Sequence, residues 1–214
     1  MLVANSFPKN FLHGLSATLL LIPAIAPSAA VNQFPIVRKD IPIVIDADRS
    51  EFDYANNRLL FHGLRLDQCD LGIVANVAET EELDFADGEW ILTGDVIIET
   101  ATGTLWCDHA VLTFTGYELA AADLSGLPAR FEQIAVESGK MNSGEGNKII
   151  YKLTGGTLQL IEKAHFFDGA NKVSGDLITY DLRAQNLKAD AGDSGPVKIL
   201  IESPNQQKEK SAQP

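Results

Sequence analysis

Residue types that carry catalysis and metal binding are scarce in this chain. Its 214 residues include two cysteines and four histidines. His62, His109 and His165 are well separated in the sequence and occupy unrelated positions. Cys107-Asp108-His109 is the one short cluster, but neighbouring residues of a strand point to opposite faces, which disfavours a joint metal or nucleophile site. We therefore expect a protein that is not an enzyme and that needs no metal or cofactor.

Positive charge is also in short supply. The chain has 17 Lys and Arg against 29 Asp and Glu, which gives a net charge of −12. Such a surface repels nucleic acid, so no nucleic-acid partner is expected. An anionic ligand would have to be held through burial of its apolar part rather than through its head group. The acidic clusters at residues 48–53 and 79–84 lack the spacing of a calcium-binding loop and are interpreted as solvated turns.

The sequence has a single long apolar run, from Phe11 to Ile25, which is shorter than the roughly 20 residues of a membrane span. A weakly basic start precedes it, and the small residues Ser28, Ala29 and Ala30 follow it. This order is typical of a secretory signal peptide. We predict that residues 1–30 are a signal peptide cleaved near Ala30, and the alternative is an uncleaved N-terminal anchor.

The two cysteines, Cys69 and Cys107, leave two readings open. Export to an oxidising compartment would permit a disulfide between them. Alternatively, Cys107 is a small buried residue of a strand and Cys69 is unpaired in a turn.

Helical periodicity is absent apart from Phe131–Val136, which is compatible with one turn of helix. Short β-type runs instead recur every 8 to 12 residues. Turn-forming pairs separate them, such as Asn56-Asn57, Asp87-Gly88 and Gly155-Gly156. This spacing is typical of an all-β sandwich or roll.

Three segments, which start at Phe52, Leu83 and Tyr151, repeat the same pattern at a period of about 31 residues. Gly63 of the first copy aligns with Gly94 of the second, and the third copy has Glu162 at that position. A period of this size indicates small β units stacked side by side.

Within a unit the buried face of the strand changes side. Leu105 and Cys107 share one parity, whereas Ala110, Leu112 and Phe114 share the other. A strand that changes its inward face has bent or bulged, and can pass from one sheet to an opposing sheet. The repeat therefore predicts two facing sheets.

Composition divides the rest of the chain. Residues 31–204 are predicted to form one β domain, interrupted by a flexible insert at 138–147, where Gly, Ser and Asn dominate. Residues 205–214 are polar and predicted to be a disordered tail.

Five motifs resemble the OstA-like family of periplasmic lipopolysaccharide transport proteins, LptA above all, with LptC a close relative. They are Ile45–Asp48, Phe61–Gly63, Leu92–Ile98, Leu105–Asp108 and Val173–Tyr180. The resemblance implies an open jelly-roll, a taco-like shape of two facing antiparallel sheets. It also implies a periplasmic protein of Gram-negative outer-membrane biogenesis that moves lipopolysaccharide from an LptC-like inner-membrane protein to an LptD-like outer-membrane protein. Units of the family dock head to tail.

The lipid site expected from this fold lies between the sheets, where apolar side chains could bury the acyl chains of lipid A. The candidate lipid-binding residues are Ile43, Ile45, Leu64, Leu66, Leu92, Val96, Ile98, Leu105, Leu112, Phe114, Leu160, Phe166, Val173, Tyr180 and Leu182. The same positions would form the core of any β-roll, so only those near an open edge are expected to touch lipid.

Unpaired strand edges are expected at the two ends of the roll. Ile41–Ile45 and Pro196–Ile201 are the natural edge strands, and they could pair with a second copy or a related protein. Three other functions remain open on this evidence: an LptC-like anchored component, an exported polysaccharide-binding or polysaccharide-hydrolysing β protein, and an envelope scaffold that oligomerises without a ligand.

Overall fold

The computed structural model describes residues 41–82, 86–135, 139–193 and 195–201. The predicted signal peptide and the predicted tail at 205–214 lie outside these residues. The described part contains strands and no helix, so none of it forms a helix able to cross a membrane. The twelve strands are β1 (Val44–Asp46), β2 (Arg49–Asp53), β3 (Arg58–Gln68), β4 (Leu71–Thr80), β5 (Gly88–Glu99), β6 (Gly103–Thr115), β7 (Glu118–Ile134), β8 (Met141–Lys152), β9 (Thr157–Phe167), β10 (Asn171–Asp181), β11 (Asn186–Asp190) and β12 (Lys198–Ile201).

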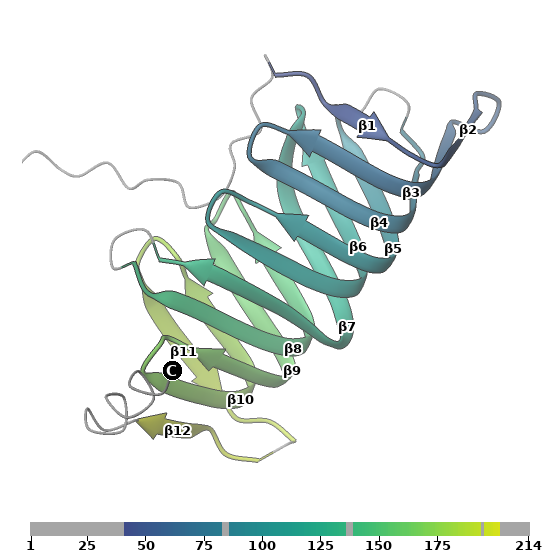
Figure 1. Ribbon diagram of the computed structural model, residues 1–214. Coiled ribbons are helices and arrows are strands. Elements are labelled where there is room, and N and C mark those ends of the chain that lie inside the picture. The colour runs from purple at the N-terminus through teal and green to yellow at the C-terminus, as the bar shows by residue number, and fades with distance from the viewer. Residues whose placement is uncertain (1–40, 83–85, 136–138, 194, 202–214) are drawn as a thin grey trace, which may run out of the picture.

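All strands belong to one antiparallel sheet, and from β3 to β11 each strand pairs with the next in sequence. Figure 1 shows them stacked along one axis, with β1 and β2 at one end and β11 and β12 at the other. The predicted all-β fold is confirmed. The predicted edge strands lie at the ends as well, although the first begins at Val44 rather than Ile41, after Pro42, which has no N–H to donate to a ladder.

The long strands bend near their middle, as Figure 1 shows. At the bend the pairing register shifts, for example between Trp106 and His109 where β6 pairs with β7. Buried residues change parity there: Cys107 and Ala110 are both buried, as the sequence pattern predicted. The two facing layers are therefore the two halves of one folded sheet, joined along this line of bends, which we call the corner.

Each layer has its own set of strand halves. Layer A comprises residues 49–62, 77–82, 86–93, 109–125, 148–161 and 177–190. Layer B comprises residues 44–46, 64–74, 96–107, 129–135, 139–145, 164–175 and 198–201. The hydrophobic core fills the space between them. In layer A, the row nearest the corner runs through Phe61, Ala78, Leu92, Ala110, Leu124, Ile149, Leu160 and Ile178.

The corner needs left-handed backbone in several strands. Gly63 and Gly94 adopt φ values of 62° and 80°. In the third copy Glu162 and Lys163 take φ values of 59° and 54°, although only glycine adopts this region without strain. The bend therefore persists where its glycine is missing. The Glu162 carboxylate also accepts a hydrogen bond from Asn147 Nδ2 of the neighbouring strand, at 3.1 Å.

The flexible insert predicted at 138–147 is wrong from Met141 onward, because these residues form the first part of β8. Gly144 serves close packing rather than mobility. A Cβ on Gly144 would lie 2.4 Å from Cε1 of Phe131 and 2.8 Å from Cδ1 of Leu160. β7 and β9 hydrogen-bond to either side of this segment, which satisfies its backbone without apolar side chains of its own.

The helical turn predicted at Phe131–Val136 is also wrong, since β7 continues to Ile134. Ala129, Phe131 and Gln133 are buried while Arg130 and Glu132 are exposed, which is the alternation of a strand. β7 and β8 thus form a further unit of the repeat, one that the sequence comparison did not detect.

The cysteine question resolves in favour of free thiols. Cys69 is exposed and Cys107 is buried, and neither is in a disulfide. Burial, together with the nearby Asp108 carboxylate, raises the pKa of Cys107 to about 12, so this thiol stays protonated at neutral pH.

Candidate lipid-binding site

The residues predicted to line the lipid site all contribute to the apolar interior. Twelve of them belong to the buried core, and the other three, Ile43, Ile45 and Tyr180, are partly buried and pack against it. The structure therefore brings the predicted set together in one continuous body. Whether any of them touches lipid stays a prediction.

Their depth differs along the strands. Leu92 and Leu160 lie in the row beside the corner and are completely inaccessible to solvent. Leu105, Val173 and Leu182 lie nearer the strand ends and are 7%, 9% and 6% exposed. A ligand that enters from the strand ends would meet the second group first.

The edge opposite the corner carries the turns of both layers, and we call it the mouth. Each hydrogen bond between neighbouring turns joins residues of the same layer. In layer A, Tyr117 N–H donates to Ala86 O at 2.8 Å, and Leu182 N–H donates to Gly156 O at 2.9 Å. In layer B, Ile134 N–H donates to Thr102 O at 2.8 Å. These bonds stiffen each side of the mouth separately and do not tie one side to the other.

Side chains close the mouth near the C-terminal end. The rings of Phe166 from layer B and Tyr180 from layer A lie 5.2 Å apart between centroids. Burial raises the pKa of Tyr180, and a hydrogen bond from the Asn142 side chain of layer B partly offsets that effect. Between the layers, a space of about 10 Å³ beside Leu105 and Leu158 is large enough for about one water molecule. The two layers are thus in contact at this end of the mouth.

Sequence reasoning missed the polar residues buried at the mouth. They are Gln68, Thr80, Gln133 and Asn142, each less than a tenth exposed. Gln68 Nε2 donates to the backbone oxygen of Ile41 at 3.0 Å and so anchors the N-terminal end of the described chain. The alternation of Leu64 and Leu66 places Gln68 on the inward face, so this signal was present in the sequence.

Chemistry beyond burial finds little support in the interior. Among the residues that the structure describes, no group of three or more His, Cys, Asp or Glu side chains is arranged to hold a metal ion. Burial raises the pKa of Tyr151 well above its usual range, which keeps its hydroxyl neutral. What the interior offers is apolar surface between two layers that are joined along one side.

Comparison with known proteins agrees with this geometry. The sequence model of the family described as "LptA/(LptD N-terminal domain) LPS transport protein" matches residues 72–186, more than half of the chain. The chain belongs to this family. Membership confirms the resemblance seen in the sequence and the expectation of a transport component rather than an enzyme.

Individual relatives support the same assignment. The chain is 29% identical over 135 residues to the lipopolysaccharide export system protein LptA of Haemophilus influenzae. The aligned region covers 61% of this chain and 78% of that protein. It is 27% identical over 136 residues to LptA of Escherichia coli K12, with 63% and 72% covered. The fold is similar to the crystal structure of LptH, the LptA-homologous periplasmic component of lipopolysaccharide transport in Pseudomonas aeruginosa. That match has a TM-score of 0.50 at 18% identity, over 78% of this chain and 99% of LptH.

Proposed function

We propose that this protein is a periplasmic carrier of lipopolysaccharide, which holds the acyl chains of lipid A between layers A and B. The observation that supports this best is the continuous apolar core between two layers that are halves of the same bent strands and are joined through the backbone at the corner. A protein that transports lipopolysaccharide must keep the hydrocarbon of lipid A out of water. In this protein the apolar side chains that could do so lie between the two layers.

The energetics favour opening only when lipid is present. Separating the layers in water would expose core side chains at roughly 1.5–3 kcal/mol each. Acyl chains that slide into the gap would cover those side chains again, and each of their methylene groups would contribute about 0.8 kcal/mol. The closed state is therefore the expected form of the empty protein.

The mouth is the proposed entry. Leu105, Phe114, Val173 and Leu182 would meet acyl chains first, whereas Leu92 and Leu160 would stay packed beside the corner. Opening at the C-terminal end requires the ring contact between Phe166 and Tyr180 to separate and the Asn142 hydrogen bond to break. Backbone pairing within each layer can stay intact throughout.

Photo-crosslinking tests this route. A photoreactive p-benzoylphenylalanine at Phe166 or Tyr180 replaces one aromatic ring by another and places the probe at the mouth. We expect each variant to crosslink to lipopolysaccharide in vitro. The matched control is the same probe at Tyr54, which is 75% exposed outside the core.

Crosslinking from Tyr54 with equal yield, or its absence from both mouth positions in folded protein, would contradict acyl-chain burial. A second probe at Phe61, beside the corner, measures depth. A weaker yield at Phe61 than at Phe166 is expected if chains enter from the mouth.

The two ends of the sheet are the proposed docking surfaces. At the N-terminal end, β2 edges layer A and β1 edges layer B. At the C-terminal end, β11 edges layer A and β12 edges layer B. Ile199, Leu200 and Ile201 of β12 are 63%, 59% and 74% exposed, which is unusual for apolar residues of a strand. We propose that these edges pair head to tail with a second copy, or with LptC-like and LptD-like proteins of the two membranes.

Native mass spectrometry over a range of protein concentrations tests the docking proposal. Leu200→Lys places a charge on the exposed edge and is expected to reduce head-to-tail association about tenfold or more. Leu127→Lys is the control, because Leu127 is 86% exposed at the corner, away from both ends. Equal association of the two variants would exclude β12 as the contact.

A further inference from the structure

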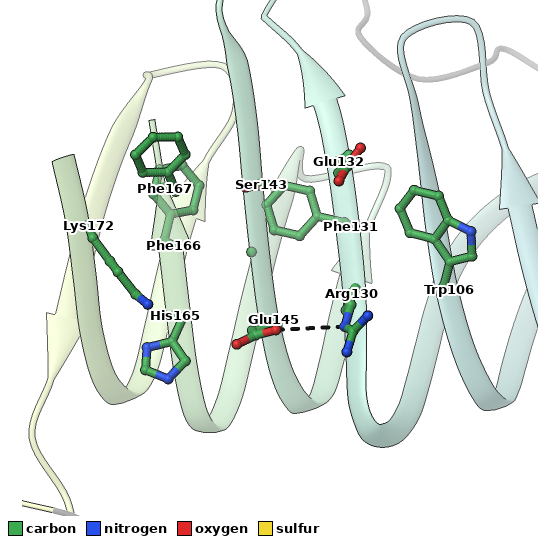
Figure 2. A pocket seen from close by; sticks show the side chains of 11 residues that line it. Trp106, Arg130, Phe131, Glu132, Ser143, Glu145, His165, Phe166, Phe167 and Lys172 are labelled. Atoms are coloured by element: carbon green, nitrogen blue, oxygen red, sulfur yellow. Dashed lines mark ion pairs between the residues drawn. The ribbon is translucent and has the colours of Figure 1, made fainter. Parts of the chain in front are cut away.

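A second hollow lies on the outer face of layer B, away from the core. Figure 2 shows its lining side chains, which come from the adjacent strands β6 to β10. Its volume is about 650 Å³. Binding sites for small ligands usually have volumes of about 300–1,000 Å³. The volume of this hollow, which we call the groove, therefore suits a compact ligand better than the flat surface of another protein.

Two rows of outward-facing residues contribute most of the lining of this groove, and Phe131, Gly144 and Phe166 of the row between them complete it. One row pairs Trp106 with Arg130, then Glu145, His165 and Ser174 on successive strands. The other row pairs Thr104 with Glu132, then Ser143, Phe167 and Lys172. The small side chain of Ser143 lies between Glu132 and Phe167, and this deepens the groove at its centre.

The lining combines an exposed aromatic face with both hydrogen-bond donors and acceptors. Trp106 is 36% exposed, whereas the other tryptophan, Trp90, is only 4% exposed. Arg130 Nε lies 3.7 Å from Glu145 Oε2, and Figure 2 marks this ion pair between the neighbouring strands β7 and β8. His165 Nδ1 and Ser174 Oγ are hydrogen-bonded at 2.8 Å, which fixes the imidazole at the far side of the groove.

We infer that this groove binds a short oligosaccharide. A sugar ring presents an apolar face of C–H groups, which matches an exposed indole, and a rim of hydroxyl groups that both donate and accept hydrogen bonds. Arg130 and Lys172 supply donors, and Glu132 and Glu145 supply acceptors. The two positive and two negative side chains balance, which suits a neutral ligand.

Other ligand classes match less well. Hydrocarbon would have to strip water from four charged side chains without replacing their hydrogen bonds. A free phosphate or other small anion would meet two carboxylates in the groove and a chain with a net charge of −12. The inference goes beyond the proposed acyl-chain carriage, because the groove lies on the opposite face of layer B from the core. The sugar could belong to lipopolysaccharide or to a free glycan.

Titration calorimetry of the full chain with acyl-free ligands tests the inference. The two probes are a neutral, phosphate-free O-antigen oligosaccharide released from lipopolysaccharide, and maltohexaose. We expect saturable binding of at least one of them, weakened about tenfold or more by Trp106→Ala. Tyr117→Ala is the matched control, because Tyr117 is 40% exposed but outside the groove, and it should bind as the unaltered protein does.

Binding of the O-antigen oligosaccharide alone would identify lipopolysaccharide as the source, and binding of both would indicate a general glycan site. The absence of saturable binding to either probe would overturn the inference, as would equal affinity in Trp106→Ala. Competition by inorganic phosphate would overturn the neutral ligand class. Because neither probe carries acyl chains, failure here leaves the crosslinking test of acyl-chain burial unaffected. Circular dichroism establishes that each variant is folded.

Discussion

Two neighbouring hairpins of this protein, β5–β6 and β7–β8, form equivalent parts of the sheet from very different sequences. The inward face of β5–β6 is apolar throughout, from Trp90 to Phe114. The inward face of β7–β8 includes Gln133, Asn142 and Gly144. Both hairpins nevertheless pair along nearly their whole length with the strands on either side.

The difference shows that large side chains of one unit can cover the interior surface of the next unit in a stacked sheet. The Phe131 ring of β7 and the Phe166 ring of β9 lie 6.2 Å apart between centroids, although β8 separates their strands. They approach over Gly144, which has no side chain of its own. One unit can therefore be poor in apolar residues if its neighbours are large enough to cover it.

The largest expected effect tests whether the two hairpins contribute equally to the core. Leu92 of β5 and Ile149 of β8 occupy the same row beside the corner, and both are completely buried. Leu92→Ala and Ile149→Ala should each lower the free energy of unfolding by about 2–5 kcal/mol, measured by urea denaturation. A loss below about 1 kcal/mol for Ile149→Ala alone would show that β8 is a peripheral strand.

A smaller loss of stability is expected at Gly144 of β8, where the packing requires that the residue has no side chain. Gly144→Ala puts a methyl group against Phe131 and Leu160, and should cost about 1–3 kcal/mol in the same measurement. Gly155→Ala is the control, because its nearest neighbour would be Thr157 Oγ1 at 3.6 Å, an ordinary contact. If the two variants are equally stable, the glycines of β8 are not there for packing.

A gain in stability is expected at the corner of β9, which lacks the glycine found in β5. A left-handed backbone conformation costs a residue such as Lys163 about 1–2 kcal/mol, and glycine avoids this cost. Glycine also loses more conformational entropy on folding, which offsets about 0.5–1 kcal/mol of the gain. Lys163→Gly should therefore raise the free energy of unfolding by about 0.5–1 kcal/mol. Lys152→Gly, in the extended part of β8, should lower the free energy of unfolding. If both substitutions change it in the same direction, the backbone at Lys163 is not strained.

The smallest effect concerns the turn between β9 and β10, which lies beside the β7–β8 hairpin. Burial works to raise the pKa of Asp168, but hydrogen bonds from the Asn171 side chain and the backbone N–H groups of Asn171 and Ala170 outweigh it and lower the pKa. A lowered pKa stabilises the fold above the unfolded value near 3.8, and the contribution is lost as the pH falls below it. The stability difference between the unaltered protein and Asp168→Asn should therefore shrink on acidification. A difference independent of pH between 6 and 3 would contradict this.

Local patterns in the sequence predicted some elements well and others poorly. The bend in β6 followed from the parity change between Cys107 and Ala110, because alternation within one strand is a local property. The strand character of residues 141–147 could not be predicted in the same way, since the reason for Gly144 lies in Phe131 and Leu160 on the flanking strands. The outer groove was missed for a similar reason: Trp106 and Lys172 are far apart in sequence and share a face only through the register of five strands.

The candidate lipid site shows the same division. Alternation placed Leu92, Leu105 and Leu182 on the inward face, and the structure agrees. Their order of depth between corner and mouth depends on which half of each strand lies nearest a turn, which the pattern of a single strand does not express.

By itself, the sequence determined the all-β fold, the repeat, the bend within each unit and membership in the lipopolysaccharide transport family, because these follow from short-range alternation and a recurring motif. Only the tertiary structure decided that the two layers are halves of one sheet, that they are in contact near the C-terminal end of the mouth, and that Gly144 in β8 is covered by neighbouring rings. Those properties depend on contacts between residues of different strands, and such contacts exist only once the chain has folded.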